Sequence, residues 1–288
     1  MPPSAFADAL PGLLDRHGGK LFALALRLTG NRADAEELLQ DAMLQAHRKW
    51  HTFRGEADAG TWLFTIVARL GRRRLARAKT LGRMPALSQV APWNETESSR
   101  AGVETDRPPK AAERAEARET LERAILTLPP AFRVPLVMKE ILELPLEDVG
   151  TALGIRPETA KTRVHRARLI LRKALMEELP TVPAPAPEYE HQVCVDLLGA
   201  KLDAMDHGRA FPVASEVICR RCLAVFRELD LVQDACAELA AGVIPSGLRR
   251  ALLARTGAAP ARRPGTDPPR RASKGVSRAP RAAHRRST

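Results

Sequence analysis

The sequence predicts an all-α protein, and three observations support this fold class. Aromatic residues make up only 4% of the 288 residues, so the residue types that favour strands are sparse. Ala, Leu, Arg and Glu, which favour helices, crowd the chain. Apolar residues also recur at helical spacing. At this length we expect two modest helical domains or three small ones.

The first 80 residues are expected to form a helical bundle. Apolar spacing predicts three helices, over 10–14, 21–28 and 38–50. Gly30 suits the position just past the second helix, and Asn31 with Asp34 resembles a capping box that opens the third. After a loop, a fourth helix is predicted to begin near Thr61 and to become basic in its second half.

A linker and a second helical unit follow. Residues 81–112 contain Gly, Ser, Asn and several prolines without a sustained period, which is typical of a linker. In the unit over 113–179, Gly154 and Ile155 would make a tight turn, and Gly150 would let two helix axes approach, as in a helix-turn-helix. Helices are predicted over 113–128, 134–142, 146–153 and 157–175.

The polar face of the last of these helices is a candidate binding surface. Removing its apolar stripe leaves mainly cationic and hydroxyl side chains. Lys and Arg can bond to phosphates and to guanine edges in a major groove. The alternative is a solvated helix on an ordinary helical bundle, and the turn chemistry favours DNA binding. The residues expected to point outward or to flank this surface are Glu158, Lys161, Thr162, His165, Arg166 and Arg168.

The charge of the chain agrees with a polyanionic partner. Lys and Arg number 46 against 34 acidic residues, a formal net charge of +12. Much of the excess lies at the end of the chain, where 257–288 carries nine Lys or Arg and one Asp. The segment 255–288 is expected to be a disordered basic tail that adds DNA affinity without sequence specificity.

The sequence gives no sign of a membrane partner or of secretion. It has no run of 18 uncharged apolar residues, and no basic segment precedes an apolar core at its start, so we expect a cytoplasmic protein. In a reducing compartment its cysteines are expected to be metal-linked, redox-active or buried, rather than to form a disulfide framework. They are Cys194, Cys219, Cys222 and Cys236.

Three segments, in this order and separated by a linker, resemble the extracytoplasmic-function (ECF) group of the sigma-70 initiation factors. They read DAEELLQDAMLQAHRKWHTFRG, TWLFTIVARL and EDVGTALGIRPETAKTRVHRARLILRKAL. The resemblance covers about residues 8–178. It implies that 1–80 is a region 2 bundle that binds the β′ clamp helices of core RNA polymerase and melts the minus-ten element. It also implies that 113–179 is a region 4 unit that reads the minus-35 element of promoter DNA.

The resemblance also implies a polymerase-binding face on the segment 34–41. Carboxylates with apolar edges suit a partner helix pair that bears arginines. The alternative is a solvated acidic helix. The loop over 53–60 corresponds to the segment that captures a flipped base, with no single contact assigned. The matching core-binding residues are Asp34, Glu36, Glu37, Leu38, Gln40 and Asp41.

The resemblance also implies two sets of DNA-binding residues. An aromatic residue beside an arginine row suits opened strands, although Trp62 fits the apolar side of its helix and is expected to belong to the core. Family members often carry Asn and Asp where this chain has 70–73. The region 2 set is Trp62, Arg69, Arg72, Arg73, Arg74 and Arg77. The region 4 set is Arg156, Glu158, Thr159, Lys161, Thr162, Arg163, His165, Arg166 and Arg168.

The segment 188–254 resembles the zinc-containing anti-sigma fold, whose motif is an early ligand followed by His-x3-Cys-x2-Cys. The resemblance implies that Cys194, Cys219 and Cys222 bind a cofactor, zinc or another divalent metal. Thiolates three residues apart on a helix can converge on one ion. Ser215 stands at the family's histidine position, so His191 is the first choice for a fourth ligand. His207 and Cys236 are further choices, and the alternative is a zinc-free domain with buried cysteines.

These features predict a sigma factor that binds core RNA polymerase and directs promoter-specific initiation, with a fused C-terminal domain that regulates it. That domain would make an intramolecular anti-sigma-like contact that masks the binding surfaces, or would instead be required for activity. The alternative is a helix-turn-helix regulator that works without core polymerase. The sequence has no phosphate loop, HExxH, nucleophile elbow or dinucleotide fingerprint, so it is not expected to be an enzyme.

Overall fold

The computed structural model describes residues 5–77, 111–178, 185–240 and 242–257. Most of the expected linker and nearly all of the expected basic tail lie outside these ranges. Within them the secondary structure consists of helices and turns, which confirms the all-α prediction. None of these helices combines the length and the apolar character needed to cross a bilayer.

The N-terminal unit contains α1 (Phe6–Thr29), α2 (Arg32–Lys49) and α3 (Ala59–Arg77), which pack on one another. Gly30 has φ 84°, and the Asn31 side chain accepts a hydrogen bond from the Asp34 N–H at 2.9 Å. The prediction of two helices before Gly30 is wrong, because α1 runs unbroken through Gly18 and Gly19.

These two glycines serve close packing instead of ending a helix. A Cβ on Gly19 would lie 1.9 Å from the carbonyl oxygen of Gly242, and one on Gly18 would lie 3.1 Å from the Ile244 side chain. The chain that leads to the last helix therefore crosses α1 where a larger residue would clash.

The second unit contains α5 (Ala111–Thr127), α6 (Pro130–Leu136), α7 (Leu146–Leu153) and α8 (Pro157–Glu178). The predicted helix over 134–142 begins earlier, at Pro130, because the fixed φ of proline suits the first helical position. It continues into a π-helical turn over Val137–Ile141.

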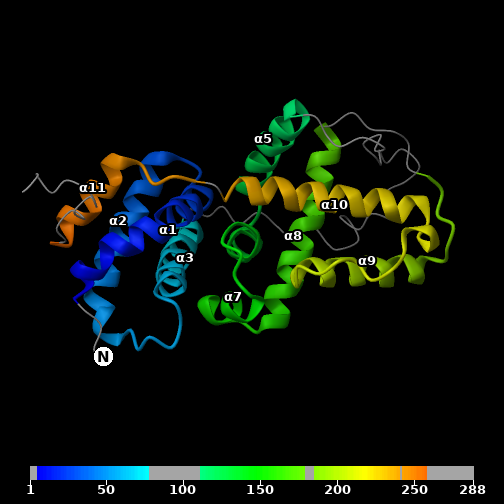
Figure 1. The fold of residues 1–288 in the computed structure, drawn as a ribbon. Coiled ribbons are helices and arrows are strands. Elements are labelled where there is room, and N and C mark those ends of the chain that lie inside the picture. The colour runs from blue at the N-terminus through cyan, green and yellow to red at the C-terminus, as the bar shows by residue number, and fades with distance from the viewer. Residues whose placement is uncertain (1–4, 78–110, 179–184, 241, 258–288) are drawn as a thin grey trace, which may run out of the picture.

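The C-terminal part contains α9 (His191–Asp206), a 3₁₀ turn (Ser215–Val217), α10 (Arg220–Glu238) and α11 (Ser246–Arg255). The long α10 packs along α5 and α8, and α9 packs against α10 (Figure 1). Beyond them, α11 packs on α1 and α2. The C-terminal part therefore contacts both preceding units.

One apolar core joins the two units that the sequence separates by a linker. Helix α3 packs against α6 and α7, and α1 packs against the π-helical turn. Ion pairs add to this contact, with Arg27 lying 2.9 Å from Glu122 and Lys20 lying 2.5 Å from Glu143. A smaller apolar cluster lies mainly between α9 and α10.

Candidate nucleic-acid interface and thiol cluster

The helix-turn-helix of α7 and α8 has the predicted turn. Gly154 follows α7 with φ 67°, a conformation that favours glycine. A Cβ on Gly150 would lie 2.9 Å from the carbonyl oxygen of Ile155, so the expected close approach at this position is confirmed. The turn thus holds the start of α8 tightly against α7.

Helix α8 has three faces. Of the predicted apolar stripe, Ala160, Val164, Ala167 and Leu171 are fully buried, and Ala174 is half-buried. A second face, exposed or half-buried, borders a concave surface with a volume of about 520 Å³. The third face contacts α9. Among the residues that the structure describes, the second face is the one left open to a partner.

The open concave surface carries three arginines, two threonines and one glutamate. The Nε of Arg166 is buried and has no hydrogen-bond partner among the described residues. Guanidinium and hydroxyl groups on one surface can bond to phosphate oxygens and to base edges. The lining residues are Phe132, Arg156, Glu158, Thr159, Thr162, Arg163 and Arg166.

The third face of α8 is covered by carboxylates of α9. Lys161 forms an ion pair with Asp203, and His165 Nε2 lies 2.6 Å from Asp206 Oδ2. Two predicted DNA-binding residues are therefore held within the molecule. Asp203 and Asp206 were not predicted as partners of this helix. Their spacing of three residues, which places both on one face of a helix, was the available signal.

The prediction that Arg168 points outward is wrong. Its side chain is 1% exposed and binds two buried carboxylates, Glu140 Oε1 at 2.6 Å and Asp206 Oδ1 at 2.6 Å. Burial alone would raise the pKa of Asp206, but hydrogen bonds and charges from His165 and Arg168 outweigh it and hold this pKa below its ordinary value. Arg168 thus joins α8 to α9 by charge-assisted hydrogen bonds.

Two predicted DNA-binding arginines of α3 contact the end of α7. Arg69 Nε donates to the carbonyl oxygen of Ala152 at 2.7 Å, and Arg72 donates to that of Leu153 at 3.1 Å. Cations are favourable at the carbonyl end of a helix. In this conformation these arginines hold the helix-turn-helix against the N-terminal unit.

The other predicted residues of α3 have separate environments. Arg74 pairs with Asp41 at 2.5 Å and with Glu37 at 3.4 Å, while Arg73 is exposed. The Arg77 side chain lies outside the described residues. Trp62 is half-buried in an aromatic cluster, as expected from its place on the apolar side. Its ring centroid lies 5.6 Å from that of Trp50 and 5.5 Å from that of Phe53.

The predicted polymerase-binding face of α2 is acidic and mostly accessible. Asp34, Glu37 and Asp41 are exposed, and Glu36 and Gln40 are half-buried. The prediction that Leu38 lies on this face is wrong, because its side chain is fully buried in the core. Leu38 instead belongs to the large apolar core.

Three cysteines come together where α9 and α10 begin. The sulfur atoms of Cys194, Cys219 and Cys222 all lie within 4.8 Å of one another, and all three residues are buried. Cys194 belongs to the first turn of α9. Cys219 caps the N-terminus of α10 and accepts a hydrogen bond from the Cys222 N–H at 3.5 Å.

The environment gives these thiols different acidities. Burial alone would raise the pKa of Cys219, but hydrogen bonds from backbone N–H groups, first that of Cys222, outweigh it and lower this pKa. Burial, together with the nearby Cys219 and Cys194, raises the pKa of Cys222. The Cys219 sulfur is therefore the position prepared for a thiolate.

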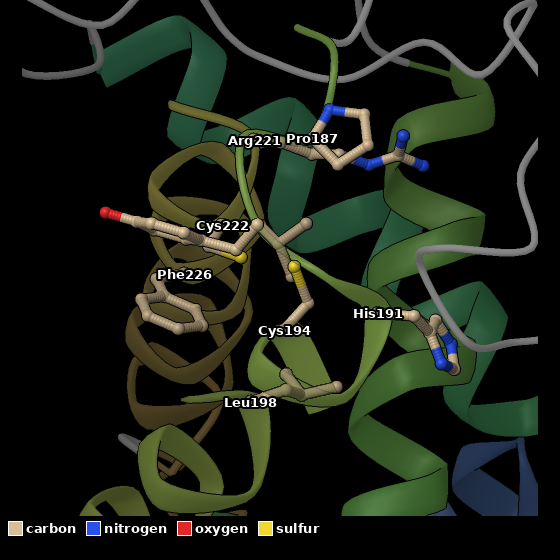
Figure 2. Close-up of a pocket in the computed structure, with 9 residues that line it drawn as sticks. Pro187, His191, Cys194, Leu198, Arg221, Cys222 and Phe226 are labelled. Atoms are coloured by element: carbon tan, nitrogen blue, oxygen red, sulfur yellow. The ribbon is translucent and has the colours of Figure 1, made fainter. Parts of the chain in front are cut away.

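The predicted fourth ligands do not join this cluster. Cys236 is fully buried in the other apolar core, 14 residues and so roughly 21 Å further along α10 than Cys222. The prediction of Cys236 as a ligand is therefore wrong. His191 lines the cavity beside the thiols, but its ring points away from the sulfur atoms of Cys194 and Cys222 in Figure 2. Within the described ranges, the group able to hold an ion consists of the three cysteines.

Comparisons with known proteins match the two sigma-like units. The family model "Sigma-70 region 2" matches residues 13–80, and "Sigma-70, region 4" matches residues 118–171. Helix α9 and the segments after it lie beyond both matches.

Characterised relatives cover the same part of the chain. The ECF RNA polymerase sigma factor SigW of Bacillus subtilis (strain 168) is 32% identical over 171 residues, which are 59% of this chain and 90% of SigW. The ECF RNA polymerase sigma factor SigM of Mycobacterium tuberculosis (strain ATCC 25618 / H37Rv) is 33% identical over 167 residues, 58% of this chain and 77% of SigM. A solved structure of the sigma factor RpoE with the anti-sigma factor NepR from Bartonella quintana has a TM-score of 0.40 at 22% identity, and the match covers 59% of this chain and 96% of that one.

Proposed function

The chain belongs to the family of ECF RNA polymerase sigma factors. On this basis we propose which of its surfaces bind promoter DNA and which bind core RNA polymerase. As a sigma factor it binds core RNA polymerase and directs initiation at specific promoters. Sigma factors are initiation factors and not themselves enzymes. We propose that the open face of α8, with Arg156, Arg163 and Arg166, reads the minus-35 element. This assignment to the minus-35 element is supported by the concave surface of arginines and hydroxyl groups on a helix-turn-helix.

The N-terminal unit has two proposed roles. The acidic face of α2 binds the β′ clamp helices, because its carboxylates suit a partner that bears arginines. The arginines of α3 bind the opened minus-ten strands. Since Arg69 and Arg72 now bind α7, they must leave it before they can reach DNA.

Reconstituted transcription tests the function. Purified protein is added to core RNA polymerase on a library of genomic promoter fragments, and run-off products are measured. Promoter-dependent products and co-elution with core polymerase are expected. DNA binding without polymerase binding would instead support a stand-alone regulator.

We further propose that the C-terminal part inhibits the sigma factor. Asp203 pairs with Lys161, and Asp206 pairs with His165, so these carboxylates take the positions that DNA phosphates would need. Because the two helices belong to one chain, their effective concentration is high, about millimolar for a short flexible linker. The inhibition therefore acts without a separate anti-sigma protein.

A pair of α9 variants tests this inhibition. Asp203→Asn removes the charge opposite Lys161 and is expected to increase promoter affinity and transcription. Asp196→Asn is the matched control, because Asp196 is exposed on the same helix and bonds to Gln192. Reduced transcription in Asp203→Asn would show that the C-terminal part is required for activity.

A further inference from the structure

We infer that Cys194, Cys219 and Cys222 form a receptor for a soft, thiophilic ion that three sulfur ligands saturate, such as trivalent arsenic. The inference concerns the chemistry of the ion and goes beyond the proposed transcription function. It rests on the number of donors, the charge they would carry and the cavity that leads to them.

The number of donors argues against a structural zinc site. Zinc in structural sites is almost always tetrahedral with four protein ligands. The described residues bring three thiols together, while Cys236 lies four turns away and the His191 ring points elsewhere (Figure 2). A zinc ion here would need a solvent molecule as its fourth ligand. Soft ions that accept three sulfur ligands need no further donor.

The surroundings favour a complex without charge. All three cysteines are buried, and the cavity beside them, about 140 Å³, has walls of Leu198, Val225 and Phe226. Three thiolates on trivalent arsenic give a neutral complex, whereas on zinc they carry one negative charge and on copper(I) two. Burying uncompensated charge in apolar surroundings is costly. Arg221 also lines the cavity and would offset at most one such charge.

The cavity also provides a route for the ion. Cys194 and Cys222 line it directly, so an ion that enters meets their sulfur atoms first (Figure 2). Arsenite is a neutral hydroxide near pH 7 and can pass apolar walls without losing a charge. In the binding step three As–O bonds break and three As–S bonds form. Each thiol proton leaves in a water molecule, and no group is oxidised or reduced.

X-ray absorption on the intact chain tests the inference, with arsenite and zinc as separate probes. Arsenite is expected to bind at one ion per chain with three sulfur neighbours. Zinc is expected to bind more weakly, with three sulfur neighbours and one oxygen. A zinc spectrum with four protein donors, or arsenite with fewer than three sulfur neighbours, would overturn the inference without any variant protein.

Single variants locate the site. Loss of a group that merely supports a ligand already costs 10–100-fold in metal affinity, so Cys194→Ser, Cys219→Ser and Cys222→Ser should each weaken arsenite binding by at least about 100-fold. Cys236→Ala and His191→Ala are the controls and should leave it unchanged. Circular dichroism checks that each variant is helical. If His191→Ala weakens zinc binding as much as Cys194→Ser does, a four-ligand zinc site is correct instead. Binding is measured without polymerase or DNA, so failure here leaves the transcription function untouched.

Discussion

Arg168 shows how much a single buried charge organises in this protein. Its guanidinium is enclosed by Glu140 and Asp206, and each partner is at most 5% exposed. A buried charge is tolerated only when its partners and hydrogen bonds compensate for lost hydration. Asp206 has a second partner in His165, so one carboxylate ties two residues of α8 to α9.

The first prediction is that Asp206→Asn destabilises the protein strongly. Removing one partner of a buried pair typically costs 3–5 kcal/mol, and with Glu140 still present we expect about 3 kcal/mol in the free energy of unfolding. Asp203→Asn is the control on the same helix, because its ion pair is half exposed, and should cost less than about 1 kcal/mol. Urea unfolding measures both, and equal losses would contradict the assigned role of Asp206.

The pH dependence of stability has a definite sign at this residue. The pKa of Asp206 in the folded state lies below its ordinary value, which is about 3.9. Its contribution is therefore complete above the unfolded pKa and is lost as the pH falls through the lower folded pKa. Unfolding measured between neutral and acid pH should show this loss in the wild-type protein and not in Asp206→Asn.

At the scale of the element, different faces of α8 serve stability and DNA recognition. Arg168 and the apolar stripe hold the helix in place, while Arg166 lies on the open concave surface. The third face, with Lys161 and His165, becomes available only if α9 leaves.

The second prediction assigns Arg166 to promoter recognition. Arg166→Ala should weaken binding to the minus-35 element by about 1–3 kcal/mol if the side chain reads a base. A phosphate contact would instead lower affinity on all sequences, so anisotropy titrations across promoter variants separate the two roles. Arg168→Ala is the contrast and should reduce stability. Unchanged promoter binding in Arg166→Ala would exclude this face from recognition.

The third prediction concerns Gly150, the glycine of α7 that packs against the turn leading to α8. The backbone carbonyl at 2.9 Å from a Cβ on Gly150 cannot move cheaply, so Gly150→Ala should destabilise by about 1–3 kcal/mol. Gly199 in α9 has nothing within 4 Å of the same position, so Gly199→Ala should stabilise by up to about 1 kcal/mol. Thermal unfolding of both variants checks the sign of each effect, and a stabilised Gly150→Ala would contradict the close packing.

At the scale of the whole molecule, the chain is closed on itself. The N-terminal unit binds α7 through Arg69 and Arg72, α9 covers part of α8, and α11 packs on α1 and α2 (Figure 1). Two of the proposed DNA-binding surfaces are thus engaged in internal contacts. For all of the proposed DNA-binding surfaces to reach a promoter, α3 must separate from α7, and α8 must separate from α9.

The fourth prediction is that this closed arrangement can be loosened from α3. Arg69→Ala with Arg72→Ala removes the hydrogen bonds to the carbonyl end of α7 and should increase the radius of gyration and the amide exchange of α7. Arg73→Ala is the control, since Arg73 is exposed on the same helix. Small-angle scattering and hydrogen exchange measure the change. An unaltered double variant would mean that the apolar contacts alone keep the units together.

Local sequence patterns were enough to predict the all-α class, the helix-turn-helix with its glycines, and a pair of cysteines three residues apart. These features are local, because spacing along one helix fixes which side chains share a face. The sequence also predicted that Asn31 caps α2 and that Trp62 packs inward. It failed at Gly18 and Gly19, which look like a helix end but accommodate a chain more than 200 residues away.

Which charged residues face outward depends on how the helices pack together and could not be predicted from the sequence. Arg166 and Arg168 both lie next to residues of the buried stripe of α8. Arg166 borders the open concave surface, whereas Arg168 binds Glu140 and Asp206, which belong to other segments of the chain. The structure brings Cys194 next to Cys219 and Cys222, as the resemblance to the anti-sigma fold implied, and it excludes Cys236 from that group. The sequence around a cation or a thiol is similar whether the side chain is exposed or buried. Its partner depends on how helices far apart in the chain pack together.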